Sequence, residues 1–153
     1  MVVQSNWIDL YGHVTAARCT PVRPCRLRVL ARYGVGESYT REEHKGSSRS
    51  LNTRSLSELV LGDEIELSIR FFDDDDKQLL SLFELRRVRD GCLSTTMEQL
   101  SLNVSLATRK VRPFQTHLQS RLKTAVAAHA PPSKVCPDAS RYALPRRKPA
   151  AAK

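Results

Sequence analysis

Residues 64–71 alternate strictly between polar and apolar side chains, and this alternation constrains the fold more than any other feature of the chain. The apolar side chains stand at every second position and are Ile65, Leu67, Ile69 and Phe71. A period of two places the apolar side chains on one face of a β-strand and the polar ones on the other. The pattern therefore predicts a strand that is buried on one face and solvated on the other.

Two more strands follow in the sequence, separated by short turns. The acidic run at residues 73–76 ends the first strand and is typical of a solvated turn. Residues 78–88 predict the second strand, and Asp90-Gly91 is a hairpin signal. The third strand ends in an alternating pattern, Leu100, Leu102, Val104 and Leu106. Three consecutive strands with short turns predict an antiparallel meander.

Helical patterns stand on both sides of these strands. The first occupies residues 27–33 and ends at Gly34, a residue type that favours helix C-termini. The second begins at Pro113, which suits a first helical position, and its apolar residues recur at helical intervals as Phe114, Leu118, Leu122 and Val126. Residues 47–56 are polar and Ser-rich and predict a weaker strand. The chain is therefore expected to be an α+β protein.

At 153 residues the chain suits one domain with a buried core. It has no apolar run of membrane-spanning length and no secretory signal pattern at its N-terminus, so we expect neither membrane insertion nor secretion. Its four cysteines are scattered without a Cys-x-x-Cys pair: Cys19, Cys25, Cys92 and Cys136. This spacing argues against a zinc ribbon and a disulfide framework, and we expect a cytoplasmic protein with free thiols.

The formal net charge of +9 comes from the last third of the chain. Residues 109–153 carry eleven Lys or Arg and one acid, whereas residues 1–108 carry fourteen and fifteen. Residues 131–153 are rich in Pro, Ala and basic residues and are expected to be a disordered tail behind a domain at residues 1–130. Such a tail attracts any polyanion, but Tyr142 alone interleaves with its charges as a stacking residue. Nucleic-acid binding is therefore not the expected main function.

Residues 6–14, Asn-Trp-Ile-Asp-Leu-Tyr-Gly-His-Val, carry the clearest chemical signal. Asp9 stands three residues before the Gly12-His13 turn, and a helix is expected after that turn. The first amides of a helix are unpaired, and they polarise a carbonyl group placed beside them. A carboxylate facing such amides can pair a base or nucleophile with a carbonyl-polarising site.

This segment resembles the active-site segment of the hotdog-fold acyl-CoA thioesterases, which belong to the 4-hydroxybenzoyl-CoA thioesterase superfamily. In the betainyl-CoA thioesterase-like subfamily it reads approximately Trp-[Ile/Val]-Asp-x-x-Gly-His-[Met/Val]-Thr. The residues that fit are Trp7, Ile8, Asp9, Gly12, His13, Val14 and Thr15. Gly62-Asp63 and Met97-Glu98-Gln99 also stand where the resemblance places them. The resemblance covers residues 6–15 and 27–122.

The resemblance implies an α+β domain of hotdog type, with an antiparallel sheet of about five strands packed on one helix and an added C-terminal helix. It also implies a homodimer or a dimer of dimers, in which two sheets join edge to edge and the active sites form at the interface. The implied activity is hydrolysis of an acyl-CoA to a carboxylic acid and free CoA. CoA enters as part of the substrate, so no separate cofactor is expected, and the subfamily suggests betainyl or another short polar acyl group.

The resemblance gives Asp9 the role of general base or nucleophile. The amides of Gly12 and His13 are expected near the thioester carbonyl, and Thr15 and Gln99 are expected to position the substrate. Each residue also has an ordinary structural alternative. Asp9 can cap the turn, His13 can bond a main-chain group, and Thr15 can cap a helix. For Gln99 the alternative is an exposed position on a strand.

Arg109 and Lys110 follow the last predicted strand and are candidates for the phosphates of CoA, although surface residues there need no such role. No metal site is expected. Four consecutive carboxylates at residues 73–76 splay in different directions, whereas calcium loops space their ligands. The other histidines show no ligand spacing and are His44, His117 and His129.

Residues 18–26 depart from the family pattern where the first turns of the central helix belong. Pro21 and Pro24 inside a helix would each destabilise it by about 3 kcal/mol or more. Asn52 stands where relatives tend to have His. Acyl-CoA hydrolysis by Asp9 is the expected function. The departure leaves two alternatives, a catalytically impaired hotdog binding module and a basic polyanion-binding protein.

Overall fold

The computed structural model describes residues 1–14, 28–35, 39 and 44–129, with the backbone alone described at residues 44–49. Its named elements are the 3-10 turn η1 (Ser5–Trp7), the strands β1 (His44–Ser55), β2 (Ile65–Asp74), β3 (Gln78–Arg87) and β4 (Leu93–Ser105), and the helix α3 (Thr116–Ala128). Residues 28–32 are also helical. The α+β class predicted from the sequence is confirmed.

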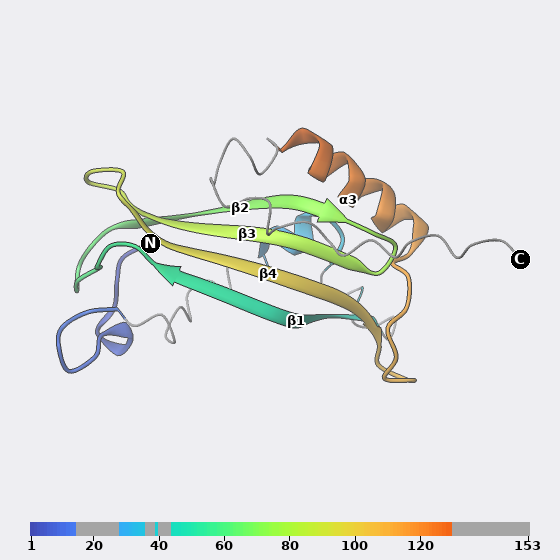
Figure 1. Cartoon of the computed structure of the whole chain (residues 1–153), viewed down its shortest axis with the longest axis horizontal. Helices are drawn as coiled ribbons and strands as arrows, with labels where there is room; N and C mark the ends of the chain where they lie inside the picture. The colour runs from blue at the N-terminus through green and yellow to red at the C-terminus, as the bar shows by residue number, and fades with distance from the viewer. Residues whose placement is uncertain (15–27, 36–38, 40–43, 130–153) are drawn as a thin grey trace, which may run out of the picture.

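The strands form one antiparallel sheet in the order β1-β4-β3-β2 (Figure 1). The strands β2, β3 and β4 are joined by short turns and form the predicted meander. The strand expected at residues 47–56 is also present as β1, and it lies at the opposite edge of the sheet from β2. The chain between β1 and β2 therefore crosses one end of the sheet. We call residues 56–60 of this connection the crossover segment.

The family pattern implies about five strands, and the sheet in the described residues has four. Beside β2, Val2 makes an isolated antiparallel bridge to Glu64. The amide of Ile65 also donates a hydrogen bond to the carbonyl of Met1 at 2.7 Å. The N-terminal residues thus lie beside the outer edge of β2, but they pair there too briefly to form a strand.

Two Asp side chains close the turns of the meander. In the β2–β3 turn, Asp75 Oδ1 accepts a hydrogen bond from the amide of Gln78 at 2.7 Å, as expected for a turn in the acidic run. In the β3–β4 turn, Asp90 Oδ1 accepts the amide of Cys92 at 3.1 Å. Gly91, which lies between Asp90 and Cys92, has a φ of +68°, which residues with a side chain rarely adopt. The hairpin predicted at Asp90-Gly91 is confirmed.

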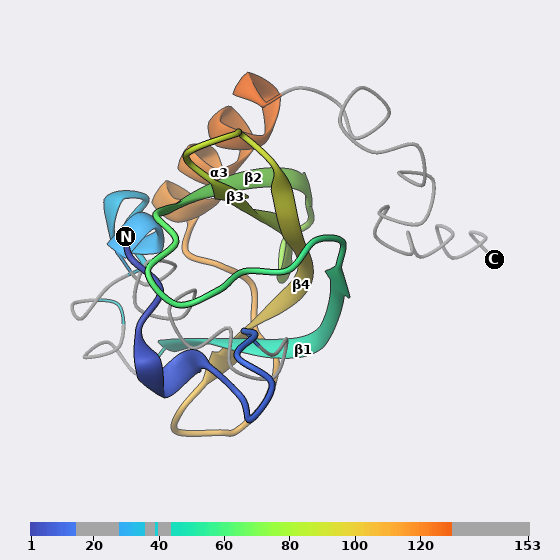
Figure 2. The same cartoon turned by 90° about the vertical axis from the view of Figure 1, so that its left-hand side faces the viewer.

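One face of the sheet packs against helical segments. The main core cluster joins β2 and β3 to the helical residues 28–32 and to α3, and it consists of Leu30, Tyr39, Phe71, Leu79, Phe114, Leu118, Leu122 and Ala125. Figure 2 shows the helical residues 28–32 on the concave side of the curved sheet and α3 beside β2. Gly34 follows the helical residues with a φ of +100°, as the sequence predicts for a helix end.

The helix α3 begins later than the sequence predicts. The apolar spacing places Pro113 at a first helical position, but the helix begins at Thr116. The amide of Phe114 donates instead to the carbonyl of Asp76 in the β2–β3 turn at 2.7 Å, and its side chain is buried in the core. The position assigned to Pro113 is therefore wrong, because Gln115 is extended with a ψ of 145° and Asn103 Nδ2 binds the carbonyl of Pro113 at 2.8 Å where a helical amide would otherwise donate.

Two predicted features lie outside the described residues. One is the family departure at residues 18–26, with Pro21 and Pro24 in the expected first turns of the central helix. The other is the basic tail at residues 131–153. The division of the chain into a domain at residues 1–130 and a tail stays a prediction.

Candidate active site

Residues 9–13, which we call the Asp9 turn, form a small hairpin at the end of the sheet that the crossover segment spans. An antiparallel bridge joins the residues on either side of it. The amide of Asp9 donates to the carbonyl of His13 at 3.0 Å, and the amide of Gly12 donates to the carbonyl of Asp9 at 3.1 Å. Gly12 has a φ of +82°, so the turn needs a residue without a Cβ at this position.

The Asp9 carboxylate is bonded to the backbone of its own turn. Its Oδ1 accepts hydrogen bonds from the amides of Tyr11 at 2.8 Å and His13 at 3.1 Å. This is the turn-capping geometry that the sequence allowed as an alternative to catalysis. The bonds fix the orientation of a half-buried carboxylate. The amides of Gly12 and His13 are both engaged within the turn, so in this structure they hold Asp9 and do not face an open anion site.

The crossover segment joins the Asp9 turn to the rest of the molecule. The amide of Val14 donates to the carbonyl of Leu59 at 3.0 Å, and His13 forms an antiparallel bridge with Val60. The side chain of Leu59 is buried in a second apolar cluster, whose other buried members are Val3, Trp7, Ile65 and Leu85. The position of Asp9 therefore depends on where the crossover segment lies.

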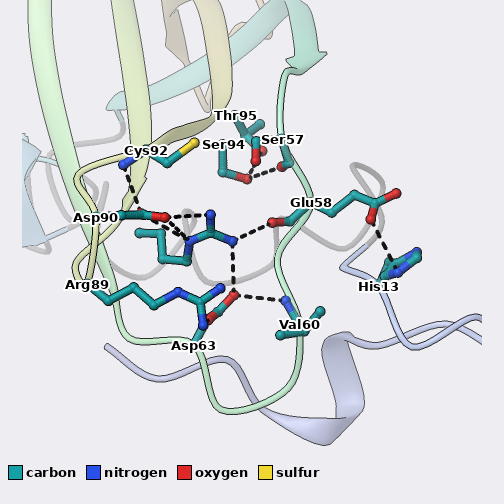
Figure 3. Close-up of polar contacts among 11 residues, drawn as sticks. His13, Ser57, Glu58, Val60, Asp63, Arg89, Asp90, Cys92, Ser94 and Thr95 are labelled. Atoms are coloured by element: carbon teal, nitrogen blue, oxygen red, sulfur yellow. Dashed lines mark hydrogen bonds and ion pairs between the residues drawn. The ribbon is translucent and has the colours of Figure 1, made fainter.

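His13 also contacts the crossover segment through its side chain. Its Nε2 lies 3.4 Å from Oε2 of Glu58 (Figure 3). The Glu58 side chain is largely exposed and that of His13 is partly exposed, and an ion pair open to solvent contributes little to stability. The contact still places a carboxylate beside the imidazole four residues after Asp9. The sequence did not indicate Glu58, because nothing in its local pattern distinguishes it from a surface acid.

A cluster of four charged side chains lies on the other side of the crossover segment (Figure 3). Arg87 donates from Nε and Nη2 to the carboxylate of Asp90, with a shortest distance of 2.7 Å. Asp63 has a side chain only 4% exposed, and it lies 3.7 Å from Arg87 Nη1 and 3.5 Å from Arg89 Nη1. The hydrogen bond from Arg87, followed by that from the Cys92 amide, lowers the pKa of Asp90 to about 2.

Gln99 lies on β4, where it is paired in register with Leu51 of β1 and Ser81 of β3. Its side chain is 2% exposed, and its Nε2 donates to Ser101 Oγ at 2.9 Å. The exposed strand position considered as an alternative is therefore wrong. Five residues of strand, about 17 Å, separate Gln99 from Ser94, whose carbonyl binds the crossover segment. The structure does not bring Gln99 to the Asp9 turn within one chain.

The turn after β4 lies at the far end of the sheet from the N-terminal residues (Figure 1) and contains Arg109 and Lys110. They belong to the turn after β4, in which the amide of Ser105 donates to the carbonyl of Lys110 at 2.9 Å. Both side chains are exposed. Along β4 this turn is roughly 40 Å from the Asp9 end. The remaining candidate, Thr15, lies outside the described residues.

Two classes of site have no counterpart in the part of the chain that the structure describes. No group of three or more His, Cys, Asp or Glu side chains there is arranged to hold a metal ion. No helix among the described residues has the length and apolar character needed to cross a bilayer.

A model of the thioesterase-like superfamily matches residues 3–122. The chain belongs to the thioesterase-like superfamily. The matched residues contain the Asp9 turn, the crossover segment, the whole sheet and the first half of α3. The matched range thus includes every candidate site residue that the structure describes, including those that lie far apart in the fold. No protein of curated function is significantly similar to this chain in sequence.

Several solved structures resemble this chain in fold at low sequence identity. One, a Staphylococcus aureus protein in complex with CoA, has a TM-score of 0.78 and 22% identity, and the match covers 85% of this chain and 83% of that one. The DHNA-CoA thioesterase from Staphylococcus aureus has a TM-score of 0.75 and 12% identity, covering 83% and 88%. A 1,4-dihydroxy-2-naphthoyl-CoA thioesterase from Synechocystis has a TM-score of 0.72 and 11% identity, covering 80% and 92%. The hotdog fold implied by the sequence is confirmed.

Proposed function

We propose that this protein is an acyl-CoA thioesterase that converts a thioester to a carboxylic acid and free CoA. The observation that carries the proposal is the Asp9 turn, in which two backbone amides hold a carboxylate in a thioesterase-like chain. The structural neighbours agree with this substrate class, since one was determined with CoA and two are named as thioesterases of CoA esters.

Asp9 acts on the carbonyl carbon of the thioester in either of two routes. As a nucleophile, it forms a mixed anhydride and releases the CoA thiolate, and water then hydrolyses the anhydride. As a general base, it takes a proton from a water molecule that attacks the thioester directly. The thiolate is a good leaving group, so neither route needs a strong acid. Both routes need a carboxylate fixed in one orientation, which the amides of Tyr11 and His13 provide.

The charge that develops on the carbonyl oxygen requires hydrogen-bond donors. Because the amide of Gly12 donates to the Asp9 carbonyl and that of His13 to the Asp9 carboxylate, we assign Gly12 the role of closing the turn and His13 that of holding the carboxylate in the resting enzyme. We assign the oxyanion donors to the segment that begins at Thr15, where the sequence predicts the unpaired amides of a helix N-terminus.

We also propose that two copies pair through β1. This strand has 12 residues, lies at the sheet edge, and pairs along one side only among the described strands. A second β1 added antiparallel would continue the sheet across a two-fold axis. Leu10 and Tyr11 form the tip of the Asp9 turn, at the end of the sheet where β1 ends. They are 102% and 84% exposed, and apolar tips of this kind suit a covered interface.

Pairing through β1 assigns a role to Arg109 and Lys110. In the sheet, the end of β4 beside them pairs with His44 at the start of β1. In an antiparallel pair of β1 strands, the start of one lies beside the end of the other. The basic turn of the second copy would then lie at the end of the sheet that holds Asp9. We therefore assign Arg109 and Lys110 to the phosphates of CoA bound at the neighbouring subunit's site.

The test is a thiol-release assay over a panel of short polar, aromatic and long-chain acyl-CoA esters. Asp9→Asn keeps an oxygen for the two amides and removes the charge, so we expect a loss of activity on the order of 100-fold or more. Asp76→Asn is the matched control, because Asp76 is an exposed carboxylate in the β2–β3 turn. Equal rates for the parent and Asp9→Asn would remove Asp9 from the mechanism.

The engaged amides of Gly12 and His13 favour one alternative, a hotdog module that binds CoA without hydrolysing it. Titration calorimetry with CoA distinguishes it from the enzyme. Heat of binding together with no thiol release from any ester in the panel would support the binding module. Hydrolysis of any ester that Asp9→Asn abolishes would exclude it.

A further inference from the structure

The crossover segment is held from two sides. On one side, His13 of the Asp9 turn bridges to Val60, and Val14, directly after the turn, donates to the carbonyl of Leu59. From the sheet, the Ser94 hydroxyl donates to the carbonyl of Ser57 at 2.7 Å, and Arg87 Nη1 donates to the carbonyl of Glu58 at 3.2 Å (Figure 3). Every residue from 57 to 60 thus makes a backbone contact with one side or the other.

The guanidinium of Arg87 carries several N–H donors in one plane, so it can bind Asp90 and the backbone of Glu58 at the same time. Its Nε and Nη2 bind Asp90 within its own hairpin, and its Nη1 binds the carbonyl of Glu58 in the crossover segment. Its side chain is only 15% exposed. The pair with Asp90 fixes the plane of the guanidinium and so fixes the point at which Nη1 holds the crossover segment.

Asp63 completes the arrangement at the other end of the crossover segment. Its Oδ2 accepts the amide of Val60 at 3.0 Å, and Val60 is the residue bridged to His13. The Asp63 carboxylate is nearly fully buried, so it requires the nearby guanidinium groups of Arg87 and Arg89. Arg89 is 64% exposed, which leaves Arg87 as the better-ordered partner. Arg87 therefore acts on the crossover segment twice, directly and through Asp63.

We propose that Arg87 is a positioning residue that sets the place of the Asp9 turn at the end of the sheet. Arg87 holds the carbonyl of Glu58 directly and the amide of Val60 through Asp63. Leu59 and Val60 in turn contact Val14 and His13. The effect on hydrolysis rests on the proposed function, because it concerns the distance from the Asp9 carboxylate to a bound thioester. The effect on the position of the turn does not depend on that function.

The first arm of the test measures amide hydrogen exchange. Arg87→Met keeps much of the apolar stem and removes every donor. Arg86→Met is the matched control, because Arg86 is the adjacent strand residue and its guanidinium contacts Glu84 and the carbonyl of Gly91, not the crossover segment. In Arg87→Met we expect exchange at the Val14 amide to rise about tenfold above that in the control. Exchange in the centre of β4 should match the control.

The second arm measures hydrolysis. We expect Arg87→Met to lower kcat by roughly 10- to 100-fold with KM within about twofold, because a carboxylate displaced by about 1 Å still permits binding. Arg87→Lys restores a charge beside Asp63 but not the set of three contacts. Relative to Arg87→Met, this variant should therefore regain more of the parent's melting temperature than of its kcat. A residue that only stabilised the fold would show both recoveries in parallel.

Where Arg87→Met does not fold, Asp90→Asn replaces it, since this exposed change loosens the guanidinium without burying an unpaired charge. A smaller rise in exchange at Val14 is then expected. The proposal is overturned if exchange at Val14 is unchanged in the folded variants, or if it rises equally throughout β4. If the parent protein hydrolyses no acyl-CoA, the proposed function fails, and the exchange arm still decides the role of Arg87.

Discussion

The sheet is held by different forces at its Asp9 end and along its β2 edge. Along β2, α3 packs through fully buried apolar side chains such as Leu118 and Leu122. At the Asp9 end, polar contacts add to the smaller apolar cluster around Leu59: Arg87 donates to the carbonyl of Glu58, and Asp63 accepts the amide of Val60. Apolar packing is strong but non-directional, whereas hydrogen bonds fix atoms to within a few tenths of an ångström. The comparison suggests that stability resides mainly with α3 and positional accuracy with the charged cluster.

The largest expected effect on stability lies on the α3 side. Leu118 is 0% exposed in the core, so Leu118→Ala should lower the free energy of unfolding by about 2–5 kcal/mol. Urea denaturation measures the change. Leu61→Ala, at a position 59% exposed, is the control and should stay within about 0.5 kcal/mol of the parent. Below its melting transition, Leu118→Ala should keep kcat within about twofold of the parent, and a larger loss would contradict the comparison.

Asp63→Ala should lower kcat more, and the free energy of unfolding less, than Leu118→Ala. It leaves the Val60 amide without its acceptor and Arg87 without a buried partner, for a loss of about 1–3 kcal/mol in unfolding free energy. Its kcat should nevertheless fall further than that of Leu118→Ala. Asp63→Asn retains an oxygen for Val60 and should recover part of both quantities. A kcat equal to that of the parent in Asp63→Ala would separate the cluster from the Asp9 turn.

A polar contact also exists on the α3 side, and it sharpens the comparison. The amide of Phe71 donates to His129 Nδ1 at 3.0 Å, next to the irregularity in the β2 register. His129→Phe keeps an aromatic ring beside Phe71 and removes the acceptor, so unfolding free energy should fall by about 1 kcal/mol. Amide exchange should rise at Phe71 and not at Val14. A rise at Val14 would show that the two regions are coupled.

The smallest expected effects are pH-dependent and have opposite signs at two turns. The pKa of Asp90 is lowered to about 2 by Arg87, so this pair stabilises the fold above about pH 4 and loses its contribution as the pH falls toward 2. Burial raises the pKa of Asp74, against the effect of Lys123, so the parent gains stability as the pH falls through that raised pKa.

Melting temperatures of Asp90→Asn and Asp74→Asn between pH 2 and 7 test both signs. Asp90→Asn should be less stable than the parent at pH 7, with the difference shrinking in acid. Asp74→Asn should be more stable at pH 7, with its difference shrinking as well. A difference that stays constant with pH in either variant contradicts the assigned cause.

Much of the fold could be predicted because its signals are local. The period of two in β2 and the hairpin residues Asp90-Gly91 specify the meander without any distant contact. The error at Pro113 has the opposite origin. Its apolar spacing is helical, but the carbonyl of Pro113 is bound by the side chain of Asn103, ten residues earlier in the chain. Helix boundaries set by such tertiary bonds leave no trace in local periodicity.

The candidate site divides in the same way. Asp9, Gly12 and His13 lie within one turn, so spacing alone brought them together. Arg87 acts through the register of β3 and through the crossover segment, and neither can be predicted from the residues next to it in sequence. A partial signal was present in Gly62-Asp63, which the family resemblance singles out and which the structure shows to contain a buried carboxylate.

Among the described strands β1 pairs along one side only, and this has a consequence for handling the protein. An isolated subunit presents a long row of backbone donors and acceptors to water, and any extended chain can add to such a row. If two copies pair through β1 as proposed, dilution or mutation that separates them would promote fibrous aggregation before it promotes unfolding. Lys or Pro placed on the outward side of this strand would protect a deliberately monomeric variant.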